Sequence, residues 1–217
     1  MPVSELVVRK FTNGRFAQNS YLLGDVASRA AVLVDPGEDP GGLLAEVRRG
    51  GWQVGEIWLT HGHIDHVLGV PQARARTAAP VLLHADDLPL YANVPQQAAW
   101  MGFDAPALPA PDGELRDGQQ LQVGPHAFVV RHTPGHSPGS VSFVGPGCVI
   151  AGDVLFEGSI GRTDIPGGDF FTLMRSIHAH LLTLPDDTAL YSGHGDDSTI
   201  GIERATNPFI TGEVRAG

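Results

Sequence analysis

Residues 61–66 read HGHIDH and bring three imidazoles and one carboxylate together within six positions. The segment follows the apolar, β-prone run at residues 56–59, so His61 and His63 stand where a strand ends and a loop begins. Side chains two residues apart on an extended backbone point the same way, and imidazole nitrogens bind zinc at about 2.0 to 2.1 Å. We therefore predict that His61 and His63 share one metal ion.

The second half of this segment is predicted to serve another ion. Asp65 and His66 come after Gly62, where the chain can turn away from the strand direction. A lone aspartate here could also cap the following helix. Four ligand-type residues at this spacing favour a metal site over that alternative.

Further candidate ligands follow three other apolar runs, and each has a glycine beside it. They are His136, Asp153 and His194. Ligands of α/β sheets gather outside the carboxyl ends of strands, so residues far apart in the sequence can meet at one rim. We expect these three residues to converge on the histidine-rich segment.

These residues are enough for two divalent metal ions that share a bridging carboxylate. Two ions about 3.5 to 4 Å apart leave room for a bridging water and lower its pKa toward neutrality, which gives hydroxide at pH 7. Mixed nitrogen and oxygen ligands accept zinc, iron or manganese, and zinc is the expected metal. The predicted ligands are His61, His63 and His136 for the first ion, Asp65, His66 and His194 for the second, and Asp153 between the two.

Other polar residues near these segments have two interpretations each. Asp35 ends the apolar run 31–34, where it either orients a ligand histidine or starts the turn into Pro36. His84 is interpreted as the polar end of a strand that leads into a helix. His132 closes a strand near the motif, so it is either structural or a partner of a ligand.

The composition predicts one globular domain over residues 1–217, with 42% hydrophobic and 18% charged residues. The net charge of −10 argues against a nucleic-acid or membrane surface. Cys148 is the only cysteine and lies in an apolar run, which predicts a buried thiol in a strand. The chain shows no signal-peptide pattern and no long apolar stretch, so we expect a cytoplasmic protein. The oligomeric state cannot be read from the sequence.

The order of elements predicts an α/β layered fold. Five prolines between residues 85 and 118 exclude one long helix there, and this irregular segment either lines a substrate cleft or covers the core. Strands are expected at residues 3–11, 16–23, 31–34, 56–59, 80–83, 120–123, 126–131, 141–144 and 149–151, and helices at 41–49, 71–77 and 170–182.

Taken together, these segments resemble the metallo-β-lactamase superfamily. Within it, the chain is similar to the hydroxyacylglutathione hydrolase (glyoxalase II) branch of the short, single-domain bacterial type. The resemblance rests on five motifs that lie between residues 19 and 209, namely THGHIDH at 60–66, GHSPGS at 135–140, GDVLF at 152–156, GSIGRTD at 158–164 and GHG at 193–195.

The resemblance implies an αββα sandwich, two central sheets flanked by helices, with a dinuclear metal site at one edge. It further implies hydrolysis of a small-molecule thioester, S-D-lactoylglutathione or a related acyl thiol, by a metal-bound hydroxide. Asp65 would also orient the nucleophile. Arg162 matches a position where relatives carry a basic residue near glutathione, so it either binds a substrate carboxylate or forms an ion pair with Asp164.

The longer glyoxalase II enzymes carry a C-terminal helical domain that contributes to the glutathione site, and we expect no such domain in this single-domain chain. Two alternatives therefore stay open besides the hydrolase. One is a glutathione persulfide dioxygenase with a single iron on His61, His136 and Asp153, and the other is a non-catalytic metal-binding module. β-Lactam, lactone and phosphodiester hydrolysis are further possibilities, since a fold does not fix a function.

Overall fold

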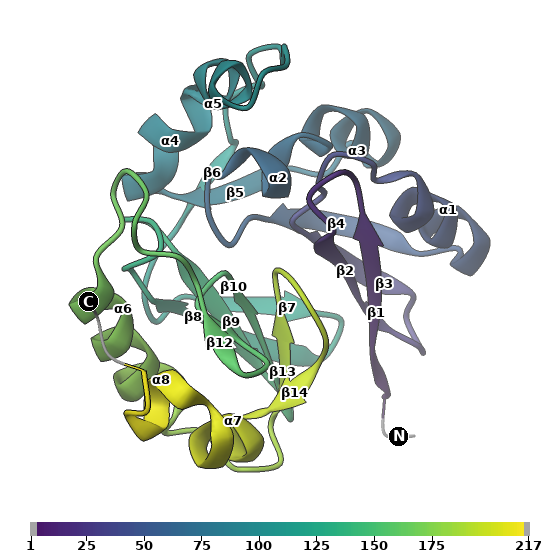
Figure 1. Cartoon of the computed structure of the whole chain (residues 1–217). Helices are drawn as coiled ribbons and strands as arrows, with labels where there is room; N and C mark the ends of the chain where they lie inside the picture. Colours follow the sequence, from purple (N-terminus) through teal and green to yellow (C-terminus); the bar gives the residue numbers. More distant parts are fainter. Residues whose placement is uncertain (1–3, 215–217) are drawn as a thin grey trace.

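The structure, a computed structural model that describes residues 4–214, consists of two six-stranded sheets packed against each other (Figure 1). Helices cover the outer face of each sheet, so the layers run helix, sheet, sheet, helix. This arrangement confirms the predicted α/β class and αββα sandwich. Within residues 4–214, no helix combines the length and the apolar character needed to cross a membrane.

The first sheet begins with an antiparallel hairpin and continues with parallel strands. β1 pairs with β2 and β2 with β3 in antiparallel fashion, while β3 to β6 are parallel neighbours. Its strands are β1 (Leu6–Asn13), β2 (Gln18–Asp25), β3 (Ala30–Val34), β4 (Gln53–Trp58), β5 (Val81–His84) and β6 (Gly113–Leu115).

The second sheet is antiparallel apart from the parallel pair β10 and β13, and its order is β14-β13-β10-β9-β8-β7. A small separate hairpin joins β11 (Leu155–Phe156) to β12 (Ser159–Ile160). The strands of the second sheet are β7 (Gln120–Val123), β8 (His126–His132), β9 (Val141–Gly145), β10 (Cys148–Gly152), β13 (Ala189–Ser192) and β14 (Ser198–Thr199).

Helices α1 to α5 accompany the first sheet, and α6 to α8 the second (Figure 1). The first group is α1 (Gly41–Gly50), α2 (Ile64–Val67), α3 (Val70–Thr77), the 3₁₀ turn η1 (Ala85–Asp87), α4 (Leu88–Ala92) and α5 (Val94–Trp100). The second group is α6 (Phe170–Ser176), its π-helical continuation η2 (Ile177–Leu181), α7 (Ile200–Thr206) and α8 (Pro208–Thr211).

The side chains of each central strand alternate between two apolar cores, one between the sheets and one under the helices, because successive residues of a strand point to opposite faces. In β3, Val32 and Val34 face the core between the sheets, whereas Leu33 faces the core under α1 and α3. In β10, Ile150 faces the space between the sheets and Val149 the core under α6 and α7. Both sheets are thus buried on both faces, which explains why these strands read as continuous apolar runs.

The strand and helix predictions hold with small shifts. The first hairpin lies about two residues later than expected, and residue 3 is outside the described residues. The expected helix 170–182 starts as α6 and ends as η2, with Leu173, Ile177 and Leu181 buried. Cys148 is buried in β10 as predicted, and burial raises the pKa of its thiol to about 11.

Two parts of the chain were not anticipated. Residues 85–118 contain α4 and α5, because Pro89 and Pro95 occupy first-turn positions where a proline costs no hydrogen bond. The segment after β13 forms α7, whose start is capped by the Thr199 side chain. All three helices are short, so the sequence carries only a weak periodic signal for them.

Candidate metal centre

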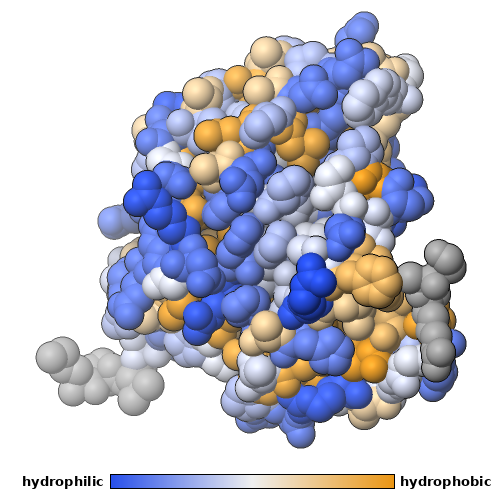
Figure 2. All heavy atoms as spheres, turned by 90° about the vertical axis from the view of Figure 1, so that its left-hand side faces the viewer, coloured by the Kyte–Doolittle hydropathy of each residue, from blue (hydrophilic) through white to orange (hydrophobic). Residues whose placement is uncertain are grey.

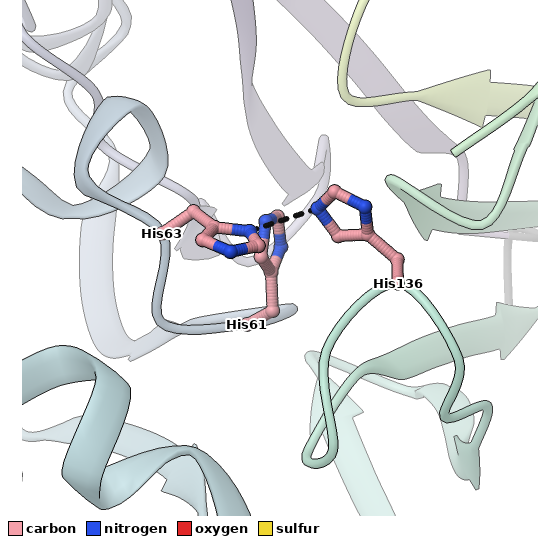
Figure 3. Close-up of side chains that lie close together, drawn as sticks. All are labelled: His61, His63 and His136. Atoms are coloured by element: carbon pink, nitrogen blue, oxygen red, sulfur yellow. Dashed lines mark hydrogen bonds between the residues drawn. The ribbon is translucent and has the colours of Figure 1, made fainter. Parts of the chain in front are cut away.

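His61, His63 and His136 point toward one another from two loops (Figure 3). The first two follow β4 and the third follows β8, the strands whose carboxyl ends meet at this edge of the sandwich. His63 Nδ1 and His136 Nε2 are 2.8 Å apart, and the ligand-type nitrogens of all three residues lie within 4.8 Å of one another. The structure thus brings together the first predicted ligand set.

Asp65, His66 and His194 form a second group beside the first, again with ligand-type atoms within 4.8 Å. His194 Nε2 lies 3.1 Å from Asp65 Oδ2, and His66 Nε2 lies 3.7 Å from the same oxygen. Asp65 and His66 belong to α2, while His194 comes directly after β13 of the other sheet. The second predicted set therefore also converges.

Asp153, at the end of β10, lies between the two groups. Its Oδ2 is 3.6 Å from His136 Nε2 of the first group and 3.6 Å from His194 Nε2 of the second. Two nitrogens on one tetrahedral zinc ion stand about 3.4 Å apart when each bond is about 2.0 to 2.1 Å. The observed spacings match a carboxylate that could contact two ions at once.

Three buried atoms in this cluster have no hydrogen-bond partner within the described part of the chain: His61 Nε2, His66 Nε2 and Asp153 Oδ1. A buried polar atom without a partner costs about 1 to 3 kcal/mol, so native proteins seldom leave several in one place. His66 Nε2 and Asp153 Oδ1 are 3.2 Å apart and still make no hydrogen bond. Such a set of unpaired donors and acceptors fits bound divalent metal ions.

The electrostatics of the first group favour neutral imidazoles. Burial and the neighbouring imidazoles of His66 and His63 hold the pKa of His61 well below its usual value. Burial and His136 lower the pKa of His63 to about 3. Neutral imidazole is the form that binds metal, so these two residues need no deprotonation at pH 7.

The second group behaves in the opposite way. Burial lowers the pKa of His66, but the carboxylates of Asp153 and Asp65 outweigh burial and hold it well above its usual value. The pKa of His194 is also raised, because the hydrogen bond to Asp65 and the charge of Asp153 outweigh burial. The raised pKa values favour the protonated form of both imidazoles, and a bound cation would compete with these protons.

Asp35 holds two ligand histidines in orientation. It follows β3, adopts a positive φ of 48°, and its Oδ2 accepts a hydrogen bond from His66 Nδ1 at 2.9 Å. The same carboxylate accepts the Thr60 hydroxyl at 2.6 Å, and Thr60 Oγ1 lies 3.0 Å from His61 Nδ1. Both imidazoles therefore present Nε2 to the cluster. Of the two interpretations of Asp35, the structure shows the contact with a ligand histidine.

The backbone of Arg162 orients the imidazole of His136. Its Nδ1 donates to the carbonyl oxygen of Arg162 at 2.9 Å, which leaves Nε2 for the cluster. The Arg162 side chain points to solvent, 72% exposed, and makes two hydrogen bonds to Asp164 at 2.9 and 3.0 Å. The ion pair predicted as one alternative is present, and Arg162 also lines the cavity described below.

Asp87 is a functional candidate that the sequence interpretation missed. It is fully buried at the end of η1, and its carboxylate accepts the backbone N–H groups of Gly62 at 2.8 Å and Gly139 at 2.6 Å, and the Ser137 hydroxyl at 2.7 Å. These bonds tie the loop of His61 and His63 to the loop of His136. Asp87 follows β5 as Asp35 follows β3, so the rule about strand ends could have found it.

Asn19 was also missed. It lies in β2, is fully buried, and donates through Nδ2 to the carbonyl oxygens of Ser192 at 3.0 Å and Gly195 at 2.9 Å. The backbone N–H of Asn19 donates to the carbonyl oxygen of Gly193 at 2.7 Å. These bonds join the first sheet to the loop that carries His194. No local signal marks this role, because the partners are more than 170 positions away.

Position 193 must be glycine because the side chains of Asp153 and His66 lie directly against its backbone. A Cβ at this position would lie 2.0 Å from Asp153 Oδ1 and 2.6 Å from His66 Cε1. No side chain can be accommodated there without moving a ligand. The glycines beside the candidate ligands thus serve close approach here, as expected.

His84 and His132 lie outside the cluster. Their rings stack with centroids 4.2 Å apart, and His132 Nε2 is 2.9 Å from the Pro138 carbonyl oxygen. His84 ends β5 and accepts the Asp86 N–H, as a strand end leading into a helical turn should. The prediction for His84 is confirmed, while His132 contacts the loop of His136 rather than a ligand itself.

A cavity of about 430 Å³ opens onto the cluster. His63, Asp65, His136, Asp153 and His194 line its inner end. A volume between 300 and 1,000 Å³ is typical of small-molecule sites. The donor cluster is therefore accessible to a substrate.

The sequence pattern of the metallo-β-lactamase superfamily matches residues 13–194. The chain belongs to this superfamily. Among curated relatives, the hydroxyacylglutathione hydrolase GloC of Haemophilus influenzae is 36% identical over 199 residues, which cover 90% of this chain and 93% of GloC. This superfamily member is accordingly a metallo-hydrolase, as its sequence predicts.

Two solved structures resemble this superfamily member closely. The B3 metallo-β-lactamase BLEG-1 is 37% identical with a TM-score of 0.88, over 94% of this chain and 100% of BLEG-1. TTHA1623, solved in a di-iron-bound form, is 42% identical with a TM-score of 0.85, over 93% of this chain and 100% of TTHA1623. The fold and the use of divalent metal are thus shared with known proteins.

Proposed function

We propose that this protein is a dinuclear-metal thioester hydrolase that acts on S-D-lactoylglutathione or a related acyl thiol. The observation that supports this proposal is Asp153 Oδ2, which lies 3.6 Å from a nitrogen of each of the two donor groups at the inner end of an open cavity. The similarity to GloC, named a hydroxyacylglutathione hydrolase, supports the choice of substrate.

In this proposal, His61, His63 and His136 would hold the first ion and Asp65, His66 and His194 the second, and Asp153 would be a ligand shared by the two sets. Metal ions bound there would polarise the thioester carbonyl and lower the pKa of a water molecule. Zinc is the proposed metal, and the di-iron form of TTHA1623 makes iron the first alternative to test.

The chain's own groups would orient the nucleophile. The pKa of Asp65 is lowered, because the nearby positive charge of His66 and the hydrogen bond from His194 outweigh burial, so its carboxylate is ionised at neutral pH. An ionised Asp65 can accept a hydrogen bond from the attacking water. The leaving thiolate needs little protonation, because free thiols have a pKa near 8.5.

The test is a substrate panel on protein of defined metal content. We expect thiol release from S-D-lactoylglutathione and about two metal ions per chain, with His61→Ala losing turnover and metal. His178→Ala is the matched control, because His178 is an exposed histidine of η2 outside the donor cluster. One iron per chain together with persulfide-dependent oxygen uptake would instead establish the persulfide dioxygenase, and folding that needs metal without any turnover would establish the non-catalytic module.

β-Lactam hydrolysis is a second candidate, and the similarity to BLEG-1 favours it. A chromogenic cephalosporin in the same panel tests it directly. Turnover of the β-lactam well above that of every thioester would replace the thioester assignment. We also propose small-molecule substrates and a cytoplasmic location. Fractionation of cells that express the tagged full chain tests the location.

A further inference from the structure

The walls of the active-site cavity are apolar, in contrast to its inner end. Eight apolar side chains from separate segments of the chain line it beside the donor cluster. They are Phe16, Ile64, Leu90, Trp100, Met101, Phe156, Ile165 and Pro166. An apolar wall of this kind gains free energy when a substrate removes it from water.

Trp100 and Met101 are the most exposed part of this wall. They lie at the end of α5 with 64% and 53% of their surface exposed, among the few large hydrophobic residues of residues 4–214 that solvent reaches. Hydrophobic groups lie at the height of α4 and α5 on the face shown in Figure 2. Large apolar side chains beside a catalytic cluster are typical of ligand contact.

The position of α5 is fixed by a buried hydrogen-bonded residue. Gln97 Oε1 accepts the backbone N–H of Ile64 in α2 at 3.0 Å, and Gln97 Nε2 donates to the Leu90 carbonyl oxygen at 2.8 Å. Gln97 is only 4% exposed. The helix that carries Trp100 is therefore attached to the helix that carries Asp65 and His66, which makes the wall a built part of the site.

The arginine side chains at and near the rim of the cavity offer little attraction to the carboxylates of glutathione. Arg162 is the one cationic side chain among the lining residues, and it is held by Asp164 at the exposed rim. Arg15, whose guanidinium lies over the Phe103 ring near Phe16, is paired with Glu38 at 2.7 Å. Glutathione carries two carboxylates, so one exposed arginine already engaged by Asp164 offers it a single, weak ion pair.

We propose that this cavity selects thioesters that carry an apolar group, and that Trp100 and Met101 provide the contact. The inference rests on the proposed thioester hydrolysis and narrows its substrate class. The apolar group can belong to the acyl part or to the thiol part of the substrate. Each buried methylene is worth about 0.8 kcal/mol, which corresponds to about a fourfold rise in kcat/KM while the group stays within the wall.

Two substrate series show whether the apolar group belongs to the acyl part or to the thiol part of the substrate. The first extends the acyl chain from two to eight carbons on N-acetylcysteamine, a small thiol without charge. The second keeps an acetyl group and extends an uncharged alkyl thiol over the same range. We expect kcat/KM to rise about 15-fold per added pair of carbons in one series and to exceed the value for S-D-lactoylglutathione. A flat profile in both series would overturn the inference.

Trp100→Ala and Met101→Ala test the contact. Each should lower kcat/KM for the longest effective substrate at least tenfold more than for the two-carbon substrate. Phe171→Ala is the matched control, because Phe171 is 65% exposed on α6 and does not line the cavity. Equal losses for long and short substrates, or the same selective loss in Phe171→Ala, would contradict the role of the wall.

A binding measurement separates this inference from the proposed reaction. The thioether S-octyl-N-acetylcysteamine cannot be hydrolysed, and it should change tryptophan fluorescence through Trp100, since Trp52 and Trp58 are buried. Trp100→Phe should abolish the signal while Phe171→Ala keeps it. A signal without turnover of any thioester would refute the proposed function and leave the apolar selectivity standing, whereas turnover without a signal would refute the selectivity alone.

Discussion

The Ser137 hydroxyl donates a 2.7 Å hydrogen bond to Asp87 Oδ2 across 50 positions of sequence. The same carboxylate accepts the N–H groups of Gly62 and Gly139, so one buried side chain connects the loops of His61 and His136. Burial raises the pKa of Asp87, and the three donors act against burial. The separation between the two halves of the first ligand set thus depends on a residue that touches none of the candidate ligands' side chains.

Replacing Asp87 with alanine leaves two buried backbone N–H groups without an acceptor. At about 1 to 3 kcal/mol each, we expect a loss of about 2 to 6 kcal/mol in the free energy of unfolding, measured by urea denaturation. Metal affinity, measured by competition with a chelating dye, should fall as well. Asp86→Ala, at a 58% exposed side chain next to it, should change neither quantity. Unchanged metal affinity in a folded Asp87→Ala protein would show that the two loops hold their positions independently.

Asp35→Asn tests the orientation of His66. The amide keeps the volume but loses the charge that holds the His66 Nδ1–H, and comparable substitutions behind metal ligands weaken metal binding by about 10- to 100-fold. Thiol release should fall with metal occupancy and recover in part at high metal concentration. Asp187→Asn, in an exposed turn, serves as the control. Full affinity in Asp35→Asn would mean that packing alone fixes the imidazole.

Gly193→Ala tests the closeness of the ligands. The added Cβ would overlap Asp153 Oδ1 and His66 Cε1, so we expect loss of at least one metal ion per chain while the far-ultraviolet circular dichroism stays that of the wild type. Gly55→Ala is the matched control, because a Cβ there would meet only one atom at 4.0 Å. Normal metal content in Gly193→Ala would show that the loop can move aside without cost.

Metal loading should release protons. The raised pKa values of His66 and His194 favour protonation in the metal-free protein, so metal binding there should displace protons, whereas the lowered pKa values of His61 and His63 leave few protons to displace. We expect proton release on titration with zinc near pH 7, read with an indicator dye, and an apparent affinity that rises with pH. His194→Gln should release fewer protons. Loading without proton release would contradict the assigned protonation states.

The pKa shifts of these histidines also determine how the free energy of unfolding of the metal-free protein depends on pH. The raised pKa of His66 contributes stability below the usual value of 6.5, and this contribution is lost as pH rises through the raised value. The lowered pKa of His63, about 3, acts oppositely, because the unfolded chain binds a proton between pH 6.5 and 3 that the folded chain does not. Bound metal displaces the proton on His66 and so removes the stabilising contribution of its raised pKa. The free energy of unfolding of the metal-loaded protein should therefore fall more steeply as the pH is lowered.

The sequence by itself determined the ligand-type residues, the α/β class and the superfamily, because these depend on local features. Apolar runs mark strands buried on both faces, and the HGHIDH segment and the glycine-flanked residues His136, Asp153 and His194 mark strand ends. The tertiary structure decided what holds them and what surrounds them. Asp87, Asn19 and the Arg162 carbonyl act across long sequence separations, and Trp100 faces the cavity only because Gln97 docks α5 onto α2. Hydrogen bonds and cavity walls between distant segments leave no periodic trace along the chain, so only the folded structure reveals them.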